Sequence, residues 1–487
     1  MKVYNNPGIF FEETVATEDK ANVVVRKPAS FGATEVVGAE MGIGAFIGIA
    51  PRGAMHKDIL VTNWTEFVNE FGGFSVNSML AYAVQGYFLN GGQKAHIVRT
   101  CKYNEETCTA KVASLILQGA GERNALTIKA ENEGVWGNNI SVEITEVESN
   151  NFTLTVYLKN VKAEVYKTSL AEVEIDTKDS PLIDVIAGEE PPVAKSATAL
   201  TGGNDGISDI TDTDYVNAME VLKDSKFDML AIPGITTKAV QTAMDDFCDR
   251  KGLCRAIKDA PYSMSPSQLA TYRATLGSSA RGRMVYPYFT VSDPIGLGKN
   301  PTKDVPPSGY VMGRMSQMIR EKGAWNATAG IDAKINGILG LATPVNESDI
   351  AILNPLGITC CKSIDKIGVV IWGARTFSSD RTMKYANVRD TIDYIELSLN
   401  QSMLWSNFKG NTEELWEKIR LSVQTFLTSL WSQGGLKGAK QSEAFWVKCD
   451  SEINTQEAID NGITYCDIGV SCIKPNEFTV FRLTING

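Results

Sequence analysis

The stretch FDMLAIPG at 227–234, followed by KAVQTAMDDFCDR at 238–250, decides the fold of this chain. The first is a short, mainly apolar run closed by Pro-Gly, which predicts a buried strand and a turn. The second predicts a helix. The alternation continues with a weaker strand at 254–257, a helix at 265–276 and a strand at 284–291. Strands separated by helices predict an open, largely parallel sheet covered by helices.

The same pattern is present nearer the N-terminus. GAFIGI at 44–49 is a fully apolar run that predicts a buried strand, and AHIVR at 95–99 predicts another. Between them lie a short helix at 64–71 and a second helix whose apolar residues recur with a period near 3.6. Those apolar residues are Val76, Met79, Leu80, Ala83, Val84, Tyr87 and Phe88. Asn-Gly-Gly at 90–92 supplies the left-handed stop.

Residues 120–170 have a different pattern, because apolar and polar residues alternate with period two. This alternation predicts antiparallel strands with one face in water. The strands are expected at 126–130, 140–147, 152–158 and 163–166. Residues 101–200 carry 16 acidic and 9 basic side chains, a balance of −7. We therefore interpret 104–200 as an inserted, outward-facing β domain, with GGNDG at 202–206 at its far boundary.

Composition excludes several classes of protein. The 487 residues carry 57 acidic and 47 basic side chains, a net charge of −10, which argues against a nucleic-acid partner. A hydrophobic content of 43% excludes a disordered chain. No apolar run approaches the roughly 20 residues of a membrane helix, and the N-terminus has no signal-peptide pattern. The nine cysteines include no C-x-x-C pair, so we expect reduced, buried thiols, and the role of Cys360 and Cys361 stays open.

Catalytic motifs fail at specific positions. GLGK at 296–299 resembles a phosphate loop, but Asp293 replaces its first glycine and Asn300 replaces the hydroxyl that holds magnesium. GSSAR at 277–281 ends in arginine where a nucleophile elbow needs glycine. Two histidines leave few bases for nucleophilic catalysis, and nothing local pairs one of them with a cysteine. They are His56 and His96. We expect no enzyme, no cofactor and no metal site.

The last third contains the most regular helix of the chain. Asn411 followed by Glu414 is close to a capping box, and Gly-Gly at 434–435 ends the pattern. The apolar stripe consists of Leu415, Trp416, Ile419, Val423, Phe426, Leu427, Leu430 and Trp431. Before this helix, the proline-containing stretch 293–309 is expected to be a long loop with a functional or inter-subunit role.

Both ends of the chain are short, β-prone arms, at 1–22 and 478–487. Each arm is either an edge strand of the protein's own sheet or a strand donated to a neighbouring copy. Donation is a head-to-tail contact, and repeated contacts of that kind build rings or open helices. The candidate inter-subunit residues are Pro7, Gly8, Ile9, Phe10, Phe11, Phe478, Val480, Leu483 and Ile485.

Short blocks along nearly the whole chain resemble the tail sheath proteins of contractile phage tails, R-type bacteriocins and related injection systems. The N-terminal blocks are PGIFFEE at 7–13, IGIAPRG at 47–53, WTEF at 64–67, FLNGG at 88–92 and GVWGNNI at 134–140. The later blocks are VPPSG at 305–309, GAWNA at 323–327, WGART at 372–376, KYANVR at 384–389 and FWVKCD at 445–450. The chain departs from the family at WSNF 405–408 (an FEPN-like turn in many members), at Thr328 (commonly proline) and at Lys258, which interrupts a predicted strand.

The resemblance implies an α/β chain of five parts. The middle domain is expected to be similar to a subtilisin-like sheet without catalytic machinery, and the insertion to a β-sandwich. The parts are an N-terminal arm at 1–22, the α/β domain at 23–103 plus 201–352, the insertion at 104–200, an α+β core domain at 353–477 and a C-terminal arm at 478–487.

The resemblance also implies a structural subunit that stacks as six-membered rings around an inner tube and contracts to drive the tube through a target envelope. The implied partners are further copies of the chain, the tube protein, the baseplate and the tail terminator, in a particle assembled in the host cytoplasm. Direct nucleic-acid contact and membrane insertion are not expected. The tube-facing candidates, if they are not ordinary solvated charges, are Lys418, Arg420, Lys437 and Lys440. The alternatives are another self-assembling virion component or an α/β nucleotide-binding enzyme.

Overall fold

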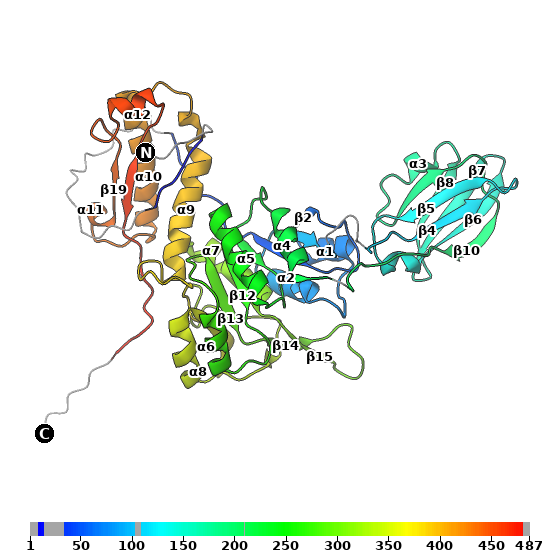
Figure 1. The fold of residues 1–487 in the computed structure, drawn as a ribbon, viewed down its shortest axis with the longest axis horizontal. Coiled ribbons are helices and arrows are strands. Elements are labelled where there is room, and N and C mark those ends of the chain that lie inside the picture. The colour runs from blue at the N-terminus through cyan, green and yellow to red at the C-terminus, as the bar shows by residue number, and fades with distance from the viewer. Residues whose placement is uncertain (1–7, 14–33, 103–108, 209, 481–487) are drawn as a thin grey trace.

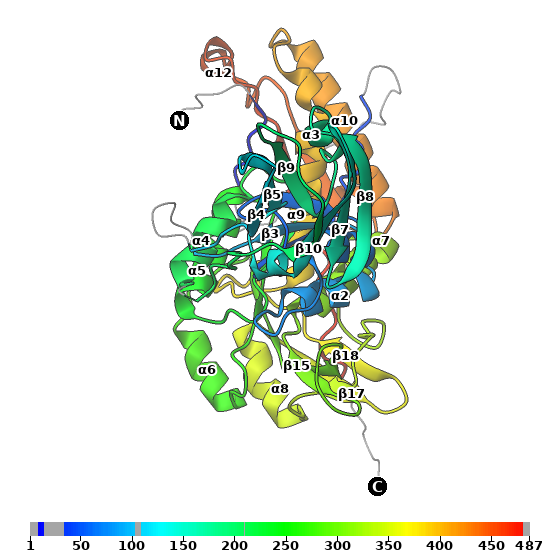
Figure 2. The same ribbon diagram turned by 90° about the vertical axis from the view of Figure 1, so that its right-hand side faces the viewer.

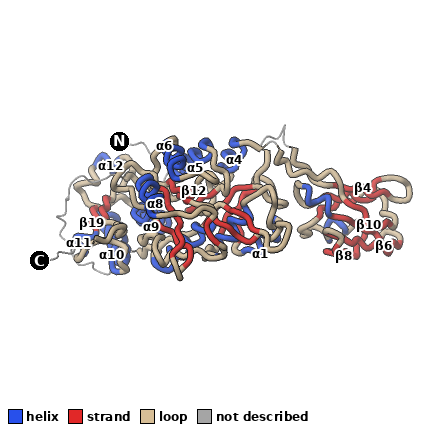
Figure 3. The backbone as a smooth tube through the Cα atoms, turned by 90° about the horizontal axis from the view of Figure 1, so that it is seen from below, coloured by secondary structure: helices blue, strands red, loops and turns tan. Residues whose placement is uncertain are grey.

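The computed structural model describes residues 8–13, 34–102, 109–208 and 210–480. Three bodies follow one another along the longest axis (Figure 1). A mixed body of sheet and helices lies in the middle, residues 109–206 form a β domain at one end, and the helices after residue 385 lie at the other. Figure 2 views the chain from the β-domain end, and Figure 3 shows the strands concentrated in the middle body and in the β domain.

The middle body contains an eight-stranded sheet. In spatial order its strands are β18 (Gly368–Trp372), β17 (Ile358–Ile364), β13 (Gly282–Tyr286), β12 (Arg255–Asp259), β11 (Met229–Ala231), β1 (Gly44–Gly48), β3 (Ala95–Arg99) and β2 (Asp58–Val61). The two edge strands are antiparallel to their neighbours, and every other pair is parallel. The predicted open, largely parallel sheet is therefore confirmed.

Helices cover both faces of this sheet. Successive residues of each buried strand point to opposite faces, so each strand contributes side chains to a core on either side. In β1, Phe46 packs in one core, and Ala45 and Ile47 pack in the other. The Phe46 side is covered by α1 (Trp64–Phe71), α2 (Leu80–Leu89) and α7 (Ser308–Lys322). The opposite side is covered by α4 (Asp212–Glu220) and α5 (Lys238–Lys251). A third core joins β13 and β17 to α6 (Pro266–Ala274) and α8 (Glu347–Leu353).

Glycines bring α2 and α7 into close contact. A Cβ on Gly309 would lie 2.1 Å from the carbonyl oxygen of Ala83, and one on Gly313 would lie 2.2 Å from that of Tyr87. Backbone atoms cannot turn aside as a side chain can, so both positions need a residue without a Cβ. The VPPSG block therefore contains a packing requirement at its last residue.

The β domain consists of two antiparallel sheets around one apolar core. One sheet has the order β4 (Ser114–Gln118), β5 (Asn124–Ala130) and β9 (Ile183–Ala187). The other has the order β10 (Lys195–Ala199), β6 (Ile140–Glu148), β7 (Asn151–Leu158) and β8 (Val161–Ser169). The 3-10 helix η1 (Val135–Asn139) and the short helix α3 (Val173–Asp176) complete it. In β7, Phe152, Leu154 and Val156 point into the core, as the period-two pattern predicts.

The C-terminal body is built on two long helices, α9 (Ala386–Ser402) and α10 (Glu413–Ser432). They pack against a two-stranded antiparallel sheet of β19 (Phe445–Lys448) and β20 (Asp467–Val470). The 3-10 helix η3 (Leu404–Ser406) and the short helices α11 (Gln441–Ala444) and α12 (Gln456–Asp460) fill the connections. The predicted apolar stripe of α10 lines the shared core, including Trp416, Ile419, Phe426 and Leu427.

Three predictions about the middle body were wrong. The strand expected at 284–291 is two strands, β13 and β14 (Phe289–Ser292), because Pro287 between them has no N–H for a sheet ladder. The loop expected at 293–309 contains β15 (Thr302–Val305), which pairs with β14, and the start of α7; β14 also pairs with β16 (Gly340–Leu341). The boundary at 352/353 is also wrong, because β17 and β18 lie within the eight-stranded sheet.

Three smaller predictions also need correction. α2 begins at Leu80, and Val76 is 74% exposed before it. The cap position of α10 is Thr412, because the Asn411 side chain accepts a hydrogen bond from Trp416 Nε1 instead. Lys258 does not interrupt β12: it is fully buried, its ammonium hydrogen bonds to Asp245, and it lies 4.2 Å from the Phe377 ring centroid.

Candidate functional site

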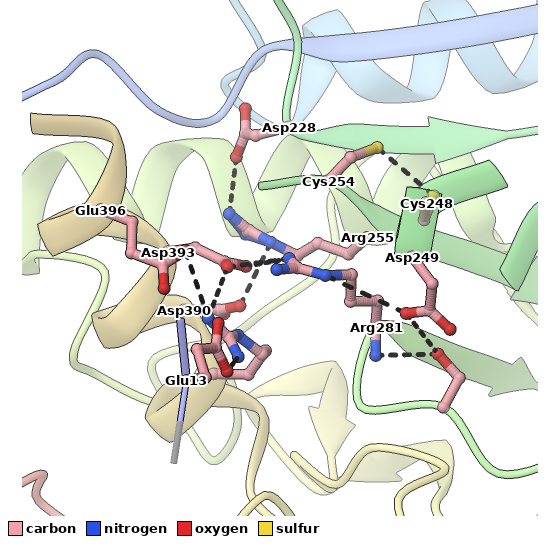
Figure 4. Close-up of polar contacts among 12 residues, drawn as sticks. Glu13, Asp228, Cys248, Asp249, Cys254, Arg255, Arg281, Asp390, Asp393 and Glu396 are labelled. Atoms are coloured by element: carbon pink, nitrogen blue, oxygen red, sulfur yellow. Dashed lines mark hydrogen bonds and ion pairs between the residues drawn. The ribbon is translucent and has the colours of Figure 1, made fainter. Parts of the chain in front are cut away.

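The described part of the N-terminal arm, residues 8–13, lies beside α9 (Figure 4). Ile9 packs against the core of the C-terminal body, and the Glu13 carboxylate accepts a hydrogen bond from Arg389 Nη1. An apolar contact and an ionic contact therefore both help to hold the arm on the C-terminal body. The other predicted arm residues are Gly8, Phe10 and Phe11, which are exposed, and Pro7, which lies outside the described residues.

A second segment of the N-terminal region, residues 34–39, also runs along the C-terminal helices. The backbone N–H of Val37 donates to Ser402 Oγ at 3.0 Å, and that of Ala39 donates to Ser398 Oγ at 2.9 Å. These serines are four residues apart, so they lie on one face of α9. Thr34 N–H donates to Ser422 Oγ on α10 at 3.0 Å. The two serines on α9 thus accept hydrogen bonds from alternate residues of the segment, which runs along the helix. The sequence prediction missed this serine pair.

Charged residues gather at the amino ends of three adjacent parallel strands. Asp228 precedes β11, Arg255 begins β12, and Arg281 precedes β13. Asp228 accepts hydrogen bonds from the backbone N–H of Gly42 at 2.8 Å and from Arg255 Nη2 at 2.6 Å. Burial raises the pKa of Asp228, and the nearby Arg255 guanidinium and backbone donors oppose that change. The strand ends therefore present buried cations toward α9.

Acidic residues of α9 meet these cations (Figure 4). Asp390 pairs with Arg283 and lies 3.2 Å from Arg255 Nε. Asp393 accepts two 2.8 Å bonds from Arg281 Nη1. The acidic residues are three apart and share one helix face. We name this set of contacts the seam, because it joins the sheet to the C-terminal body.

The seam reaches the N-terminal arm through Arg389. Its Nη2 lies 2.9 Å from Asp393 Oδ1 and 3.8 Å from Glu396 Oε2, while Nη1 donates to Glu13. Arg389 therefore faces the carboxyl groups of both Glu13 and Glu396. The seam contains the guanidinium groups Arg255, Arg281, Arg283 and Arg389, and the carboxyl groups Glu13, Asp228, Asp390, Asp393 and Glu396. Charged residues at the starts of predicted buried strands were the signal that could have found it.

Side-chain contacts hold the residues that immediately precede the C-terminal arm. Glu477 accepts from Arg375 Nε at 2.9 Å, and both side chains are largely buried. Asn387 Nδ2 donates to the carbonyl oxygen of Ile473 at 2.8 Å. Beyond Glu477 the described residues form no strand, and the exposed fractions are 72% at Phe478 and 75% at Val480. The remaining candidates, Leu483 and Ile485, lie outside the described residues.

Two of the four predicted tube-facing residues form ion pairs with glutamates on their own helix. Lys418 lies 2.8 Å from Glu414, and Arg420 pairs with Glu417, both on α10. These pairs offset much of the charge that a partner would meet. Lys437 and Lys440 follow the helix, and neither has an ion pair within the described part of the chain.

Histidine, serine and aspartate do come together at one point, but not in a catalytic order. His96 Nδ1 lies 2.8 Å from Asp58 Oδ2, and Ser225 Oγ donates to the same carboxylate. A nucleophilic serine must give its proton to the histidine. Here the aspartate takes the serine bond, so these three residues brace β2, β3 and the segment before β11.

One cysteine–histidine pair escaped the sequence prediction. Cys101 Sγ lies 3.5 Å from His56 Nε2, although the residues are far apart in the sequence. Cys101 is fully buried, and its thiol also donates to the carbonyl oxygen of Lys102. Burial lowers the pKa of His56, which favours the neutral ring. A reactive cysteine needs exposure and a cationic neighbour, so this geometry is that of a packed structural pair.

Two further searches cover the described residues. Among them, no group of three or more His, Cys, Asp or Glu side chains has the arrangement of a metal site. None of the described helices combines the length and the apolar character that crossing a bilayer requires.

Comparison with known proteins identifies the family to which the chain is similar. Residues 208–377 match the family model of the phage tail sheath protein central domain, and residues 378–486 match that of the phage tail sheath C-terminal domain. The chain is 27% identical over 316 residues to a prophage major tail sheath protein of Pseudomonas aeruginosa, covering 62% of this chain and 76% of the relative. It is 23% identical over 303 residues to the tail sheath protein of Escherichia phage P2, covering 61% and 73%.

Solved structures share the fold at low sequence identity. The contracted sheath complex of an extracellular contractile injection system superposes with a TM-score of 0.61 at 17% identity, covering 96% of this chain and 98% of that one. The sheath tail protein of Listeria innocua gives a TM-score of 0.64 at 13% identity, covering 90% and 96%. Together the two family models span 208–486, more than half of the chain. The chain belongs to the phage tail sheath protein family and is a structural subunit of a contractile sheath.

Proposed function

We propose that this chain polymerises with copies of itself as stacked six-membered rings around an inner tube, and that the polymer contracts to drive the tube through a target envelope. The observation that carries the proposal is the state of the C-terminal arm. It is anchored at Glu477, and then presents Phe478 and Val480 to solvent without a strand partner among the residues that the structure describes. Exposed β-prone residues after a fixed point suit a strand that is donated to another subunit.

The C-terminal body offers a place for such a strand. β19 and β20 form a sheet of two strands, so each has an edge that the described part of the chain does not pair. Isolated two-stranded sheets are marginal, and further strands stabilise them. We propose that the arms at 1–22 and 478–487 of neighbouring copies add to this sheet. The contact is head-to-tail, which is the type that extends into rings and helices.

Contraction in this proposal is a repacking of rigid bodies. The middle body has continuous cores on both faces of its sheet, and the seam fixes α9 to it. In this proposal the arms bend and the contacts between subunits change, while each subunit keeps its internal packing. The energy comes from a larger subunit–subunit burial in the contracted lattice, released over a kinetic barrier, and no catalytic step or nucleotide hydrolysis is part of it.

The remaining parts have complementary roles in the proposal. The β domain, with the acidic balance of −7 over residues 101–200, faces outward. The C-terminal body faces the tube, with Lys437 and Lys440 as the cations free to meet it, and the baseplate and tail terminator bind the polymer ends. The order of strands and helices in the middle body suits a subtilisin-like sheet used as a scaffold. Assembly takes place in the host cytoplasm, and the product is a particle tail.

Deleting residues 478–487 tests the proposal. The purified variant should keep the circular dichroism spectrum of the full chain, because the deletion leaves the ion pair between Glu477 and Arg375 in place. It should remain unassembled where the full chain forms cylinders in electron micrographs. A matched variant with Leu297→Ser, at a 98% exposed residue of the β14–β15 hairpin, tests whether exposed apolar residues in general are required. Cylinders from the truncated chain would overturn the arm mechanism.

A further inference from the structure

Two cysteines lie opposite one another at one end of the β19–β20 sheet. The last paired residues at that end are Lys448 and Asp467, and Cys449 and Cys466 take the next step of the same register. Both cysteines pack in the apolar core of the C-terminal body, so their side chains lie on the same face of the sheet. The two thiols therefore face each other across the strand pair.

The type of pair at this position suits a disulfide. Ser471 N–H donates to the carbonyl oxygen of Ala444 at 2.8 Å, which makes these two residues a hydrogen-bonded pair of the antiparallel register. The two pair types alternate along such strands, so Cys449 and Cys466, an odd number of steps further on, form a non-hydrogen-bonded pair. Opposite residues in such a pair have Cα atoms about 4.5 Å apart, within the range of about 4.4–6.8 Å that disulfides span.

The Asn454 side chain ties the two strands together beyond the cysteines. Its Nδ2 donates to the carbonyl oxygens of Asp450 and Tyr465, each at 3.0 Å, and its Oδ1 accepts from the backbone N–H of Tyr465 at 2.6 Å. Asp450 follows Cys449, and Tyr465 precedes Cys466. The cysteine pair is therefore held between the strand ladder on one side and a buried amide group on the other, which limits fraying at this end of the sheet.

We propose that Cys449 and Cys466 are a disulfide-forming site, that a reducing compartment keeps them as two thiols, and that a small-molecule disulfide oxidises them to a cross-strand bond that locks the β19–β20 sheet. The cysteines are free thiols in this structure, the state in which a chain made in a reducing compartment starts. The site lies within one chain, so it does not depend on the proposed function.

The oxidation consists of two thiol–disulfide exchanges. Cys466 is half-buried and Cys449 is 4% exposed, so the small disulfide reaches Cys466 first. Cys466 loses its proton, attacks one sulfur of the reagent, forms a mixed disulfide and releases one small thiolate. Cys449 then loses its proton and attacks the Cys466 sulfur, which forms the cross-strand bond and releases the second small thiolate. The two thiols give up two protons and two electrons, and the reagent takes up the electrons.

A second cysteine pair provides an internal comparison. Cys248 Sγ lies 3.4 Å from Cys254 Sγ (Figure 4), and both residues are fully buried. Proximity alone favours a bond between these two sulfurs as well. Exchange also needs a sulfur that the reagent can reach, and Cys466 meets that condition. We therefore expect the folded chain to form the bond on the β19–β20 sheet and to keep Cys248 and Cys254 reduced.

The bond stabilises the sheet through the loop that it closes. That loop has 18 residues, from 449 to 466, and contains α12. A crosslink over a loop of about this length shifts an opening equilibrium by about a hundredfold. A two-stranded sheet is marginal by itself, so the crosslink acts on the part of the C-terminal body that most needs support.

Disulfide mapping on the folded, full-length chain tests the site. Burial and the neighbouring Cys449 raise the pKa of the Cys466 thiol, so the chain is incubated with oxidised glutathione at about pH 8.5, where more thiolate is present. Peptide mass spectrometry should find Cys449 joined to Cys466, with the fully buried pair of Figure 4 still reduced. Cys472 is the matched control, because it is half-buried like Cys466 but is bridged to Leu436, so it should gain at most glutathione.

Three results of this mapping would overturn the proposal. The first is that both thiols stay reduced while the same chain reacts fully in urea. The second is that glutathione remains on Cys466 without a bond to Cys449. The third is that the fully buried pair oxidises as fast as the pair on the sheet, because accessibility would then not select the site.

Hydrogen exchange tests the lock. The amides of β19 and β20 should exchange about a hundredfold more slowly in the oxidised chain than in the reduced chain. Cys466→Ser, treated in the same way, should show no slowing. Equal exchange in the two states of the wild-type chain, or an equal slowing in Cys466→Ser, would refute the lock. Neither assay scores the formation of cylinders, so failure here and failure of the proposed function are separate results.

Discussion

Arg281→Met is expected to loosen the C-terminal body from the sheet. The substitution removes two 2.8 Å bonds from Arg281 Nη1 to the carboxylate of Asp393, a side chain that is 1% exposed. Within the described part of the chain, Asp393 then keeps Arg389 as its one ion-pair partner. Breaking one partner of a buried ion pair costs about 3–5 kcal/mol, because the remaining charge stays out of water. The free energy of opening α9 should fall by that amount.

Native-state hydrogen exchange measures this opening directly. At about 1.4 kcal/mol per factor of ten, the amides of α9 should exchange about 100- to several-thousand-fold faster in Arg281→Met. Arg420→Met provides the control, since it removes an ion pair with Glu417, whose side chain is 52% exposed. Such a surface pair contributes at most about 1 kcal/mol, so the control should change exchange by less than about fivefold. An equally small effect of Arg281→Met would refute the reasoning that the seam fixes the two bodies.

Three more predictions concern packing and charge. Gly309→Ala should destabilise the middle body by about 1–3 kcal/mol or more in urea unfolding, because the new Cβ would meet the backbone of α2, whereas Gly277→Ala, with open space around it, should be nearly neutral. Lys258→Met should cost about 3–5 kcal/mol by the same assay, since it leaves the buried Asp245 unpaired; a change below about 1 kcal/mol would contradict that ion pair. Lys437→Glu should weaken co-sedimentation with tube protein and reduce its salt dependence, and a salt-insensitive wild-type complex would argue against a charged tube contact.

The sequence predicted best where one local pattern determines one element. The apolar run of β1 and the Asn-Gly-Gly stop after α2 each act through neighbouring residues, so β1 formed and α2 ended where they were expected. The prediction failed where a single proline changed the pairing. Pro287 divides β13 from β14, and apolar residues continue on both sides of it, so the run alone does not show the break.

Local sequence patterns did not predict the seam, and the reason is a different one. Asp228 and Arg255 each look like a charged residue at the border of an apolar run, which normally means a surface position. Only the parallel order of the strands brings them together, and only the packing of α9 supplies their partners. Residues far apart in the sequence, such as Glu13 and Arg389, therefore form a site that spacing alone does not announce.

The central claim is that this chain assembles with itself through its arms, and electron microscopy of the purified full-length protein tests it most directly. The account predicts long hollow cylinders built from stacked six-membered rings, with density for a donated strand beside the two-stranded sheet of β19 and β20. A protein that stays monomeric over the whole concentration range, or cylinders in which that sheet keeps two strands, would contradict it.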